Sequence, residues 1–489
     1  MKKLGMILCF LACVFLAAYL LTCNTNIDDE EKDYFRPITP VKVNPPAPDP
    51  TAPEGQLIVV GNKIYNMRTA EEVRLTGANA YEYDIIADWK RLGSSGSRLE
   101  MSIDALFDIW HGNVVRLPLE VNNSEIYGGH GQKMPQGNYP EYIEAIKYFV
   151  SVAERHKKYI ILDLHTYVML TERCMAFWRE WIQVPELVNN PYVLFGLLNE
   201  PLAVSWETWR NGGSEMGDYR YGYQQLIEMI RDAGAKNIVL TAGLDWGYDL
   251  RGVVGEAPSD RKVYALVDQG SGGDKSKTGY GIIYESHIYP WKGMEEWYAA
   301  GSPPGKTMEF CYNDWIDKIG TIRKIAPVLI GECGWQFTDV AFILSTIPDF
   351  DDQDKRNAMM EAEFAPGKAA HHTNWMPALL EFFDDEKTYG SRLHYTAWCF
   401  SMLSSPILLT KAGWQTGHDP NNYDGYDPET ATRRMNLLNS AANSLTPEQR
   451  IDLFTPNDFS GIYFYEHMRA YAELRGEDVG PQLYFRSQE

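Results

Sequence analysis

The chain has 489 residues and a formal net charge of −21, with 45% hydrophobic and 23% charged residues. These proportions are typical of a globular protein, and the length allows either several domains or one large α/β barrel with insertions. The acidic excess argues against nucleic acid and anionic lipid surfaces as partners, since both require clustered Lys and Arg. An uncharged ligand such as a neutral polysaccharide is compatible with it.

The first 23 residues have the pattern of an export signal. Lys2 and Lys3 precede an apolar run over residues 4–21, and Leu-Leu-Thr-Cys at 20–23 resembles a bacterial lipobox, in which the cysteine is lipidated. We therefore expect lipidation at Cys23 and a cell-surface or outer-membrane lipoprotein. A periplasmic or secreted protein with a plain signal peptide, or an uncleaved signal anchor, is the alternative. The membrane would be contacted only through this N-terminal segment.

Residues 24–55 are acidic at first and then rich in proline. Proline at this density favours extended chain and opposes a packed core, so this segment is predicted to be a tether. Residues 56–489 contain no internal repeat and are predicted to form one catalytic domain.

The elements predicted along the domain alternate between strand and helix. Residues 57–65 form a hairpin around a Gly-Asn turn. Apolar runs then predict eight strands, at 73–79, 113–118, 159–165, 193–200, 237–242, 284–287, 328–332 and 395–398. Helical periodicity predicts helices at 99–110, 142–155, 177–181, 223–233 and 315–325.

Continuous apolar strands that alternate with helices predict a parallel sheet, and eight such units close a (β/α)₈ TIM barrel. The N-terminal hairpin would cover one end of this barrel. Long loop insertions are expected at 333–394 and 411–452. Such loops commonly shape a substrate cleft.

Most of the predicted strands end in a polar, ionisable or aromatic residue. Barrel enzymes place their active sites at the C-terminal ends of the strands, so these side chains are expected to converge on one rim. They are Asn79, Arg116, His165, Asn199, Glu200, His287, Glu332 and Trp398.

Glu200 and Glu332 form the most informative pair. They follow the fourth and seventh strands, and across a small barrel mouth their side chains can approach within several ångströms. A retaining glycosidase needs two carboxyls at about 5–5.5 Å, one as nucleophile and one as general acid/base. The pair therefore predicts this chemistry.

The same segments resemble glycoside hydrolase family 5, the cellulase-type family of clan A. The matching motifs occur in the family's order across most of residues 56–400, and they are Val-Val-Arg-Leu-Pro at 114–118, Leu-Asp-Leu-His at 162–165, Leu-Asn-Glu-Pro at 198–201, His-Ile-Tyr at 287–289, Ile-Gly-Glu at 330–332 and Ala-Trp at 397–398. The resemblance implies a TIM barrel and a retaining, cellulase-like endo-β-glycanase that acts on plant or microbial polysaccharide or oligosaccharide.

The resemblance also assigns roles to residues. It implies that Glu200 is the general acid/base and Glu332 the nucleophile, with Arg116 holding Glu332 ionised and Tyr289 orienting it. Because Glu200 must be protonated for its first task, we expect its site to raise its pKa.

The remaining residues are assigned to the sugar. Asn199 would bond the 2-hydroxyl, a contact that strengthens in the transition state. His165 and His287 would line the subsite at the cleaved bond, and Trp398 would stack under that sugar. Three of the assigned residues have structural alternatives, namely a salt bridge for Arg116, a satisfied core histidine for His165 and core packing for Trp398.

No metal or cofactor is expected. The sequence lacks the His-rich helix motif of metalloproteases, and Cys174, Cys311, Cys333 and Cys399 are spaced too irregularly for a zinc site. Buried free thiols are the preferred interpretation of these cysteines, with one or two disulfides as the alternative. Alternative functions are a mannanase or exo-acting glycosidase on the same machinery, and a non-catalytic surface glycan-binding protein.

Overall fold

The computed structural model describes residues 39–82, 84–119, 139–215, 217–289, 292, 308–334, 370–401, 408–409, 428–457 and 460–486. Contacts divide the chain into two units, Met1–Thr39 and Pro40–Glu489. The predicted signal and Cys23 lie outside the described residues, so export and lipidation stay predictions. In the ranges given above, we find no helix that is both long and apolar enough to cross a membrane.

The second unit includes residues that the sequence assigns to the tether. The Val41 amide donates a hydrogen bond to the carbonyl of Lys324 at 2.9 Å, and the Asp49 amide donates to Met67 at 2.9 Å. The chain is therefore packed on the domain from about residue 40, earlier than the expected start at 56. Prolines lack amide donors, but the residues between them retain theirs and pair with the domain.

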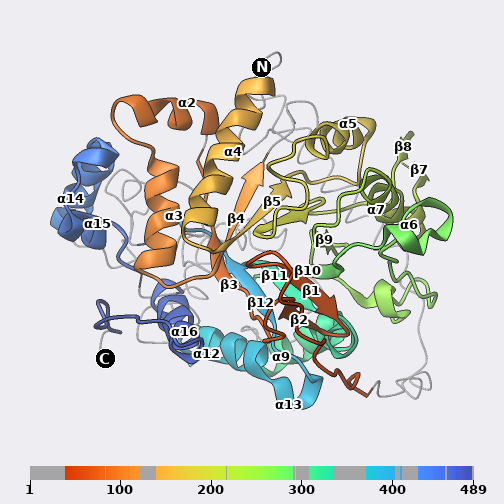
Figure 1. The fold of residues 1–489 in the computed structure, drawn as a ribbon. Coiled ribbons are helices and arrows are strands. Elements are labelled where there is room, and N and C mark those ends of the chain that lie inside the picture. The colour runs from red at the N-terminus through yellow and green to blue at the C-terminus, as the bar shows by residue number, and fades with distance from the viewer. Residues whose placement is uncertain are drawn as a thin grey trace, which may run out of the picture. The chain divides into compact units, whose positions relative to one another are not determined.

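A closed barrel of eight parallel strands forms the centre of the domain (Figure 1). Each strand pairs with the next along the chain, and the last pairs with the first. The strands are β3 (Thr76–Asn79), β4 (Val114–Leu119), β5 (Tyr159–Leu164), β6 (Val193–Gly196), β9 (Val239–Ala242), β10 (Ile282–Ile288), β11 (Val328–Cys333) and β12 (His394–Ala397). The predicted (β/α)₈ barrel is confirmed, because these runs are buried throughout and need cover on both faces.

Helices lie around the outside of the barrel, most of them between consecutive strands (Figure 1). They are α2 (Ile85–Lys90), α3 (Arg98–Asp108), α4 (Tyr139–Arg155), α5 (Glu172–Trp181), α6 (Trp206–Asn211), α7 (Tyr223–Asp232), α9 (Met308–Trp315), α12 (Ala370–Asp384), α13 (Glu386–Tyr389), α14 (Pro428–Asn439), α15 (Pro447–Leu453) and α16 (Gly461–Leu474). Of these, α14, α15 and α16 follow the last strand. The helix expected at 315–325 is instead the end of α9, a π-helical turn at Ile316–Gly320 and a 3₁₀ turn at Ile322–Lys324.

Two short hairpins flank the barrel. β1 (Leu57–Val60) and β2 (Lys63–Asn66) form the predicted N-terminal hairpin. Its Leu57 and Ile64 belong to one buried cluster with residues from the starts of the barrel strands, so the hairpin covers that end of the barrel. The second hairpin, β7 (Gly213–Glu215) with β8 (Asp218–Arg220), was not predicted and lies between β6 and α7.

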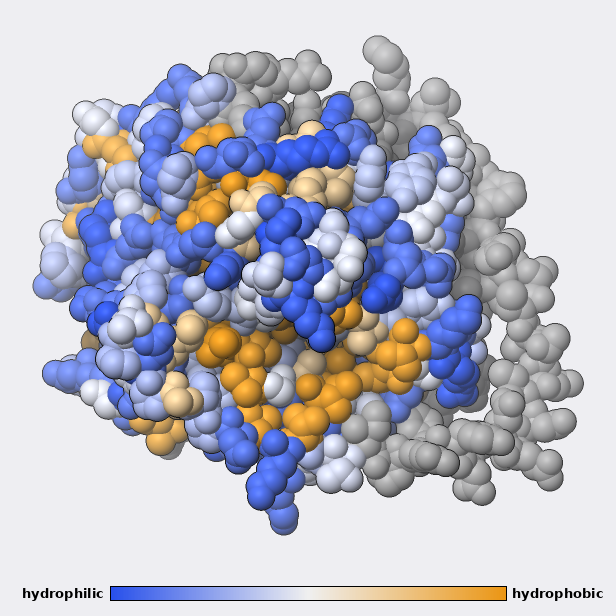
Figure 2. Space-filling view, turned by 45° about the vertical axis from the view of Figure 1, so that its right-hand side comes forward, coloured by the Kyte–Doolittle hydropathy of each residue, from blue (hydrophilic) through white to orange (hydrophobic). Residues whose placement is uncertain are grey.

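The surface in Figure 2 is mostly hydrophilic, with apolar residues gathered in a few places. Among the described residues, Trp246 is an exposed aromatic side chain, at 38% exposure, and it follows β9 at the C-terminal rim of the barrel.

Strand register brings the expected site residues together. Asn79 on β3 pairs with Arg116 on β4, and His287 on β10 pairs with Glu332 on β11. The β10–β11 register shifts between Ser286 and His287, so Gly331 is skipped. Such a bulge re-aims a side chain, and here it places Glu332 beside His287.

Candidate active site

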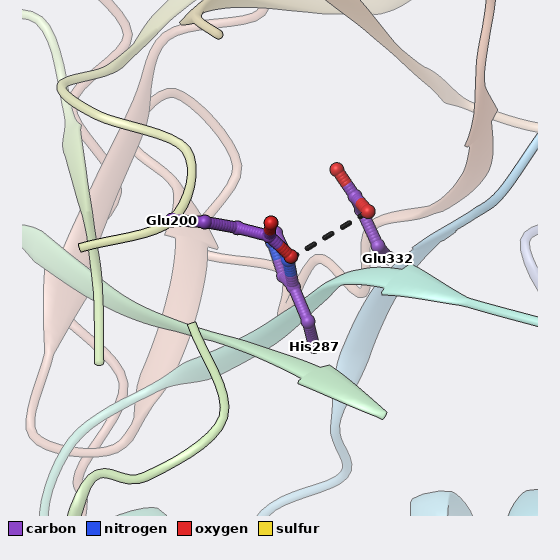
Figure 3. A group of neighbouring side chains, drawn as sticks. All are labelled: Glu200, His287 and Glu332. Carbon is purple, nitrogen blue, oxygen red and sulfur yellow. Dashed lines mark hydrogen bonds and ion pairs between the residues drawn. The ribbon is translucent and has the colours of Figure 1, made fainter. Parts of the chain in front are cut away.

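The two predicted catalytic carboxyls lie close together at the C-terminal rim of the barrel. One oxygen of Glu200, one oxygen of Glu332 and a ring nitrogen of His287 all lie within 4.8 Å of one another (Figure 3). Glu200 is 8% exposed and Glu332 is 6% exposed. Two carboxyls from strands on different sides of the barrel therefore face the same small volume, as the sequence predicts.

Glu332 is held at both of its oxygens. Arg116 Nη1 donates to Oε1 at 3.2 Å, and the Tyr289 hydroxyl donates to Oε2 at 2.8 Å. Burial and the nearby charge of Glu332 raise the pKa of Tyr289 well above its usual value, so the phenol remains a donor. These contacts agree with the positions expected for Arg116 and Tyr289 and leave Glu332 oriented and charge-compensated.

Glu200 forms a hydrogen bond with a histidine instead of standing in an apolar pocket. Its Oε1 lies 2.8 Å from Nδ1 of His287. Burial alone would raise the pKa of Glu200, but this bond and the charge of His287 reverse the effect and lower it. The expectation that the site raises the pKa of Glu200 is therefore wrong for the protein without substrate, because the hydrogen bond and charge of His287 outweigh the effect of burial.

The proton of this pair resides on His287. Burial alone would lower the pKa of the imidazole, but the charge of Glu332 and hydrogen bonds with Glu200 and Glu285 raise it to about 9. His287 is completely buried, so these carboxylates act on it with little screening by water. At neutral pH, Glu200 and His287 together hold one exchangeable proton.

Arg116 is the cation around which the site is organised. It is completely buried, which disfavours its charge, yet Asp163 and three further carboxylates raise its pKa above its usual value. Its two terminal nitrogens contact Asn199 at 2.7 Å, Asn79 at 2.9 Å, Asp163 at 3.1 Å, Glu285 at 3.1 Å and Glu332 at 3.2 Å.

Two residues of this cluster carry no role in the sequence analysis. Asp163 and Glu285 are both completely buried, and both contact Arg116. Each lies two positions before an expected site histidine, His165 directly after β5 and His287 on β10. Alternate residues of a strand share a face. An acidic residue two positions before a histidine at the rim was therefore a signal from which Asp163 and Glu285 could have been predicted as site residues.

Asn199 has one polar group engaged and one free for a ligand. Its Oδ1 accepts from Arg116 at 2.7 Å. Its Nδ2 is buried, and no acceptor contacts it within the described part of the chain. A buried donor without a partner is costly, so a ligand oxygen is the natural acceptor for this group.

Four aromatic rings lie in a row at the rim of the barrel. Trp398 stacks on His165 with ring centroids 5.5 Å apart and planes at 12°. Tyr167 lies against His165 at 5.7 Å, and Trp246 lies 6.0 Å from Tyr167. The row runs from the buried Trp398 to Trp246, which is 38% exposed.

The trio of Glu200, His287 and Glu332 also has the spacing of a metal site. Both ring nitrogens of His287 face carboxylates, with Nδ1 at 2.8 Å from Glu200 and Nε2 at 3.3 Å from Glu285. Cys174, Cys311, Cys333 and Cys399 are buried free thiols, as preferred from the sequence.

The chain is similar to known glycoside hydrolases in sequence and in fold. The family model described as Cellulase (glycosyl hydrolase family 5) matches residues 70–377. A β-glucanase of Saccharophagus degradans, solved with cellotetraose, is 19% identical with a TM-score of 0.51, and the match covers 90% of this chain and 99% of that chain. Its native form gives 20% identity, a TM-score of 0.50 and coverage of 85% and 93%.

The catalytic domain of an endoglucanase of Thermobifida fusca is 14% identical with a TM-score of 0.44, and the match covers 85% of this chain and 98% of that chain. A search of curated proteins returned no significant match. The family model spans more than half of the chain. The chain therefore belongs to glycosyl hydrolase family 5, and it is a glycoside hydrolase acting on β-linked glycans.

Proposed function

We propose that this protein is a retaining, cellulase-like endo-β-glycanase, with Glu332 as nucleophile and Glu200 as general acid/base. The observation that carries the proposal is the approach of their carboxyl oxygens to within 4.8 Å. Retaining enzymes hold the two carboxyls about 5–5.5 Å apart, whereas inverting enzymes leave about 6.5–9.5 Å for a water molecule. The observed spacing favours direct attack by a carboxylate.

In the first step, an oxygen of Glu332 bonds to the anomeric carbon while the bond from that carbon to the leaving oxygen breaks. Glu200 donates a proton to the leaving oxygen. In the second step, water replaces Glu332 at the anomeric carbon, and Glu200 takes the proton of that water. Arg116 and Tyr289 orient Glu332 for attack and stabilise its charge when it leaves.

The proton for the first step comes from the pair formed by Glu200 and His287. The charge of Glu332 is the main attraction that raises the pKa of His287. As Glu332 bonds to the sugar, this charge disappears and His287 holds its proton less tightly. The proton then passes through the 2.8 Å contact to Glu200 and on to the leaving oxygen.

Contacts to the sugar follow from the remaining residues. Asn199 Nδ2, buried and without a protein acceptor, would bond the 2-hydroxyl of the sugar at the cleaved bond. Trp398 and His165 would line that subsite. The exposed Trp246 supports binding of a further sugar unit and hence a chain-like substrate over a single sugar.

Substitution of each carboxyl tests the mechanism. Glu332→Gln and Glu200→Gln should each lower kcat by orders of magnitude on cello-oligosaccharides. With an aryl glycoside whose leaving group needs no proton, azide should accelerate Glu200→Gln, because azide attacks without a general base. Glu228→Gln on α7 is the matched control and should retain activity. Near-normal turnover of either site variant would remove its assigned role.

The stereochemistry of the first product tests retention independently. Proton NMR of a fresh reaction should show the anomeric configuration of the substrate in the first sugar released, and inversion would contradict the double displacement. Mannanase and exo-glycosidase specificities use the same carboxyl pair, and a panel of glucans, mannans and aryl glycosides separates them by product size. A non-catalytic glycan-binding role predicts no turnover on any of these.

We also propose that the protein is exported and anchored through Cys23. The proposal rests on the lipobox-like sequence at 20–23 alone. Mass spectrometry of the mature N-terminus should find a lipidated cysteine as the first residue. An intact Met1, or cleavage at another position, would contradict it.

A further inference from the structure

Two strands of the barrel carry the same arrangement of an acid and a histidine. Asp163 precedes His165 at the end of β5, and Glu285 precedes His287 on β10, each by two residues. Asp163 Oδ2 lies 2.8 Å from His165, and Glu285 Oε1 lies 3.3 Å from His287. Both acids also lie 3.1 Å from the same nitrogen of Arg116, which ties the two pairs into one network.

The two histidines use opposite ring nitrogens toward their acids. His165 contacts Asp163 through Nδ1. His287 contacts Glu285 through Nε2, so its Nδ1 faces Glu200 at 2.8 Å and Glu332 at 3.7 Å. Glu285 therefore selects the nitrogen that faces the two catalytic carboxyls.

The neighbouring strand leaves space for Glu285. A Cβ atom at Gly331 would lie 1.7 Å from Glu285 Oε1, which no real structure tolerates. The bulge opposite Ser286 and His287 is the feature that turns Gly331 toward Glu285 while Glu332 still reaches the pocket. The absence of a side chain at Gly331, directly before Glu332, therefore leaves the space that the Glu285 carboxyl occupies.

We propose that Glu285 is a positioning residue that orients His287, strengthens its hold on its proton, and thereby controls the proton supply of Glu200. The proposal rests on the proposed function for the role of Glu200. Glu285 would not touch the substrate, because it lies completely buried beneath His287.

The electrostatic surroundings of His287 support this role. Three carboxylates from three different barrel segments face its ring, namely Glu200, Glu285 and Glu332. Arg116 on β4 contacts both Glu285 and Glu332, and the charges of Lys292 and His165 act on Glu200. The backbone amide of His287 donates to Gly247, and Tyr289 donates to Glu332.

Substitution of Glu285 by glutamine removes the charge and keeps the shape. A hydrogen bond to a charged group corresponds to about one to two pKa units, so the titration point of His287 should fall by about one to two pH units in Glu285→Gln. Histidine ¹⁵N NMR without substrate measures this titration, and a His287→Gln sample assigns the resonance. The basic limb of kcat/KM should shift downward by the same amount, because it reports loss of the shared proton.

Asp163→Asn provides the matched control. Like Glu285→Gln, it removes a carboxylate that lies 3.1 Å from Arg116. It changes the contact between Asp163 and His165, however, and leaves the contact between Glu285 and His287 in place. The titration of His287 should stay within about 0.3 units of the wild-type value in this variant. An equal shift in both variants would show that the effect travels through Arg116, and that result overturns the proposal.

A measurement on the unaltered protein covers the case in which Glu285→Gln fails to fold. Above its titration point, neutral His287 should carry its proton on Nε2, where Glu285 accepts it, and ¹⁵N shifts distinguish the two tautomers. A proton on Nδ1 overturns the proposal, as does an unchanged titration in folded Glu285→Gln. The titration and the tautomer of His287 are both measured without turnover. Either result can therefore contradict the role of Glu285 while Glu200 and Glu332 keep their catalytic roles. Loss of those catalytic roles would likewise leave both measurements valid.

Discussion

Gly331→Ala adds one methyl group beside the nucleophile, at a position where the structure leaves no room for it. The added Cβ would lie 1.7 Å from Oε1 of Glu285, 2.6 Å from its Cδ and 2.8 Å from its Cγ. Gly331 is not in the left-handed backbone region, so alanine can adopt its conformation and the cost is purely steric. Glu285 is completely buried and must move for the variant to fold.

The displacement breaks the contacts that Glu285 makes. To regain an ordinary contact, which begins at 3.4 Å, its Oε1 must retreat by about 1.7 Å, which separates it from Arg116 and His287. Overpacking a core costs about 1–3 kcal/mol and breaking a buried ion pair about 3–5 kcal/mol. We expect the free energy of unfolding to fall by about 3–5 kcal/mol, within the roughly 5–15 kcal/mol of a typical domain.

Urea unfolding of Gly331→Ala in two backgrounds isolates the clash. Glu285→Ala removes the carboxyl that the methyl group meets, so in that background the further change Gly331→Ala should cost less than about 1 kcal/mol. Gly196→Ala is the control, since its Cβ would lie 3.1 Å from Asp163, and its cost should be the same with or without Glu285. An equal cost of Gly331→Ala in both backgrounds would refute the steric argument.

Two further predictions concern Tyr289 and His156. Tyr289→Phe removes the 2.8 Å bond to Glu332, worth about 1.5–3 kcal/mol, so kcat should fall about 10- to 100-fold with the fold intact, and a loss below threefold would contradict this. Hydrogen bonds with Asp104 and Asp108 raise the pKa of His156 to about 9, so their stabilisation is complete below about pH 6.5 and is lost as pH rises through 9. Because the site is partly exposed, His156→Gln should remove only about 1 kcal/mol of pH-dependent stability in urea titrations, and an unchanged dependence would exclude this pair.

The barrel fold and the pair of carboxyls, Glu200 and Glu332, could be predicted from the sequence because both follow from short-range patterns. Apolar runs identify strands that are buried on both faces, and parallel strands in a barrel end on one rim. Polar residues at those ends, such as Glu200 and Glu332, must then share that rim. The order of the strands along the chain was sufficient to predict that these two carboxyls meet.

The tertiary structure decided how the site holds its proton. Glu285 and Asp163 lie inside apolar strands, and nothing in their own segments indicates that Arg116, from a third strand, contacts both. The lowered pKa of Glu200 depends on His287, which is 87 residues away, and on the bulge that brings Glu332 beside that histidine.

Local sequence thus determined which residues reach the rim of the barrel. The three-dimensional arrangement determined their charge states, because a pKa depends on burial and on charges within a few ångströms, and those neighbours come from distant parts of the chain.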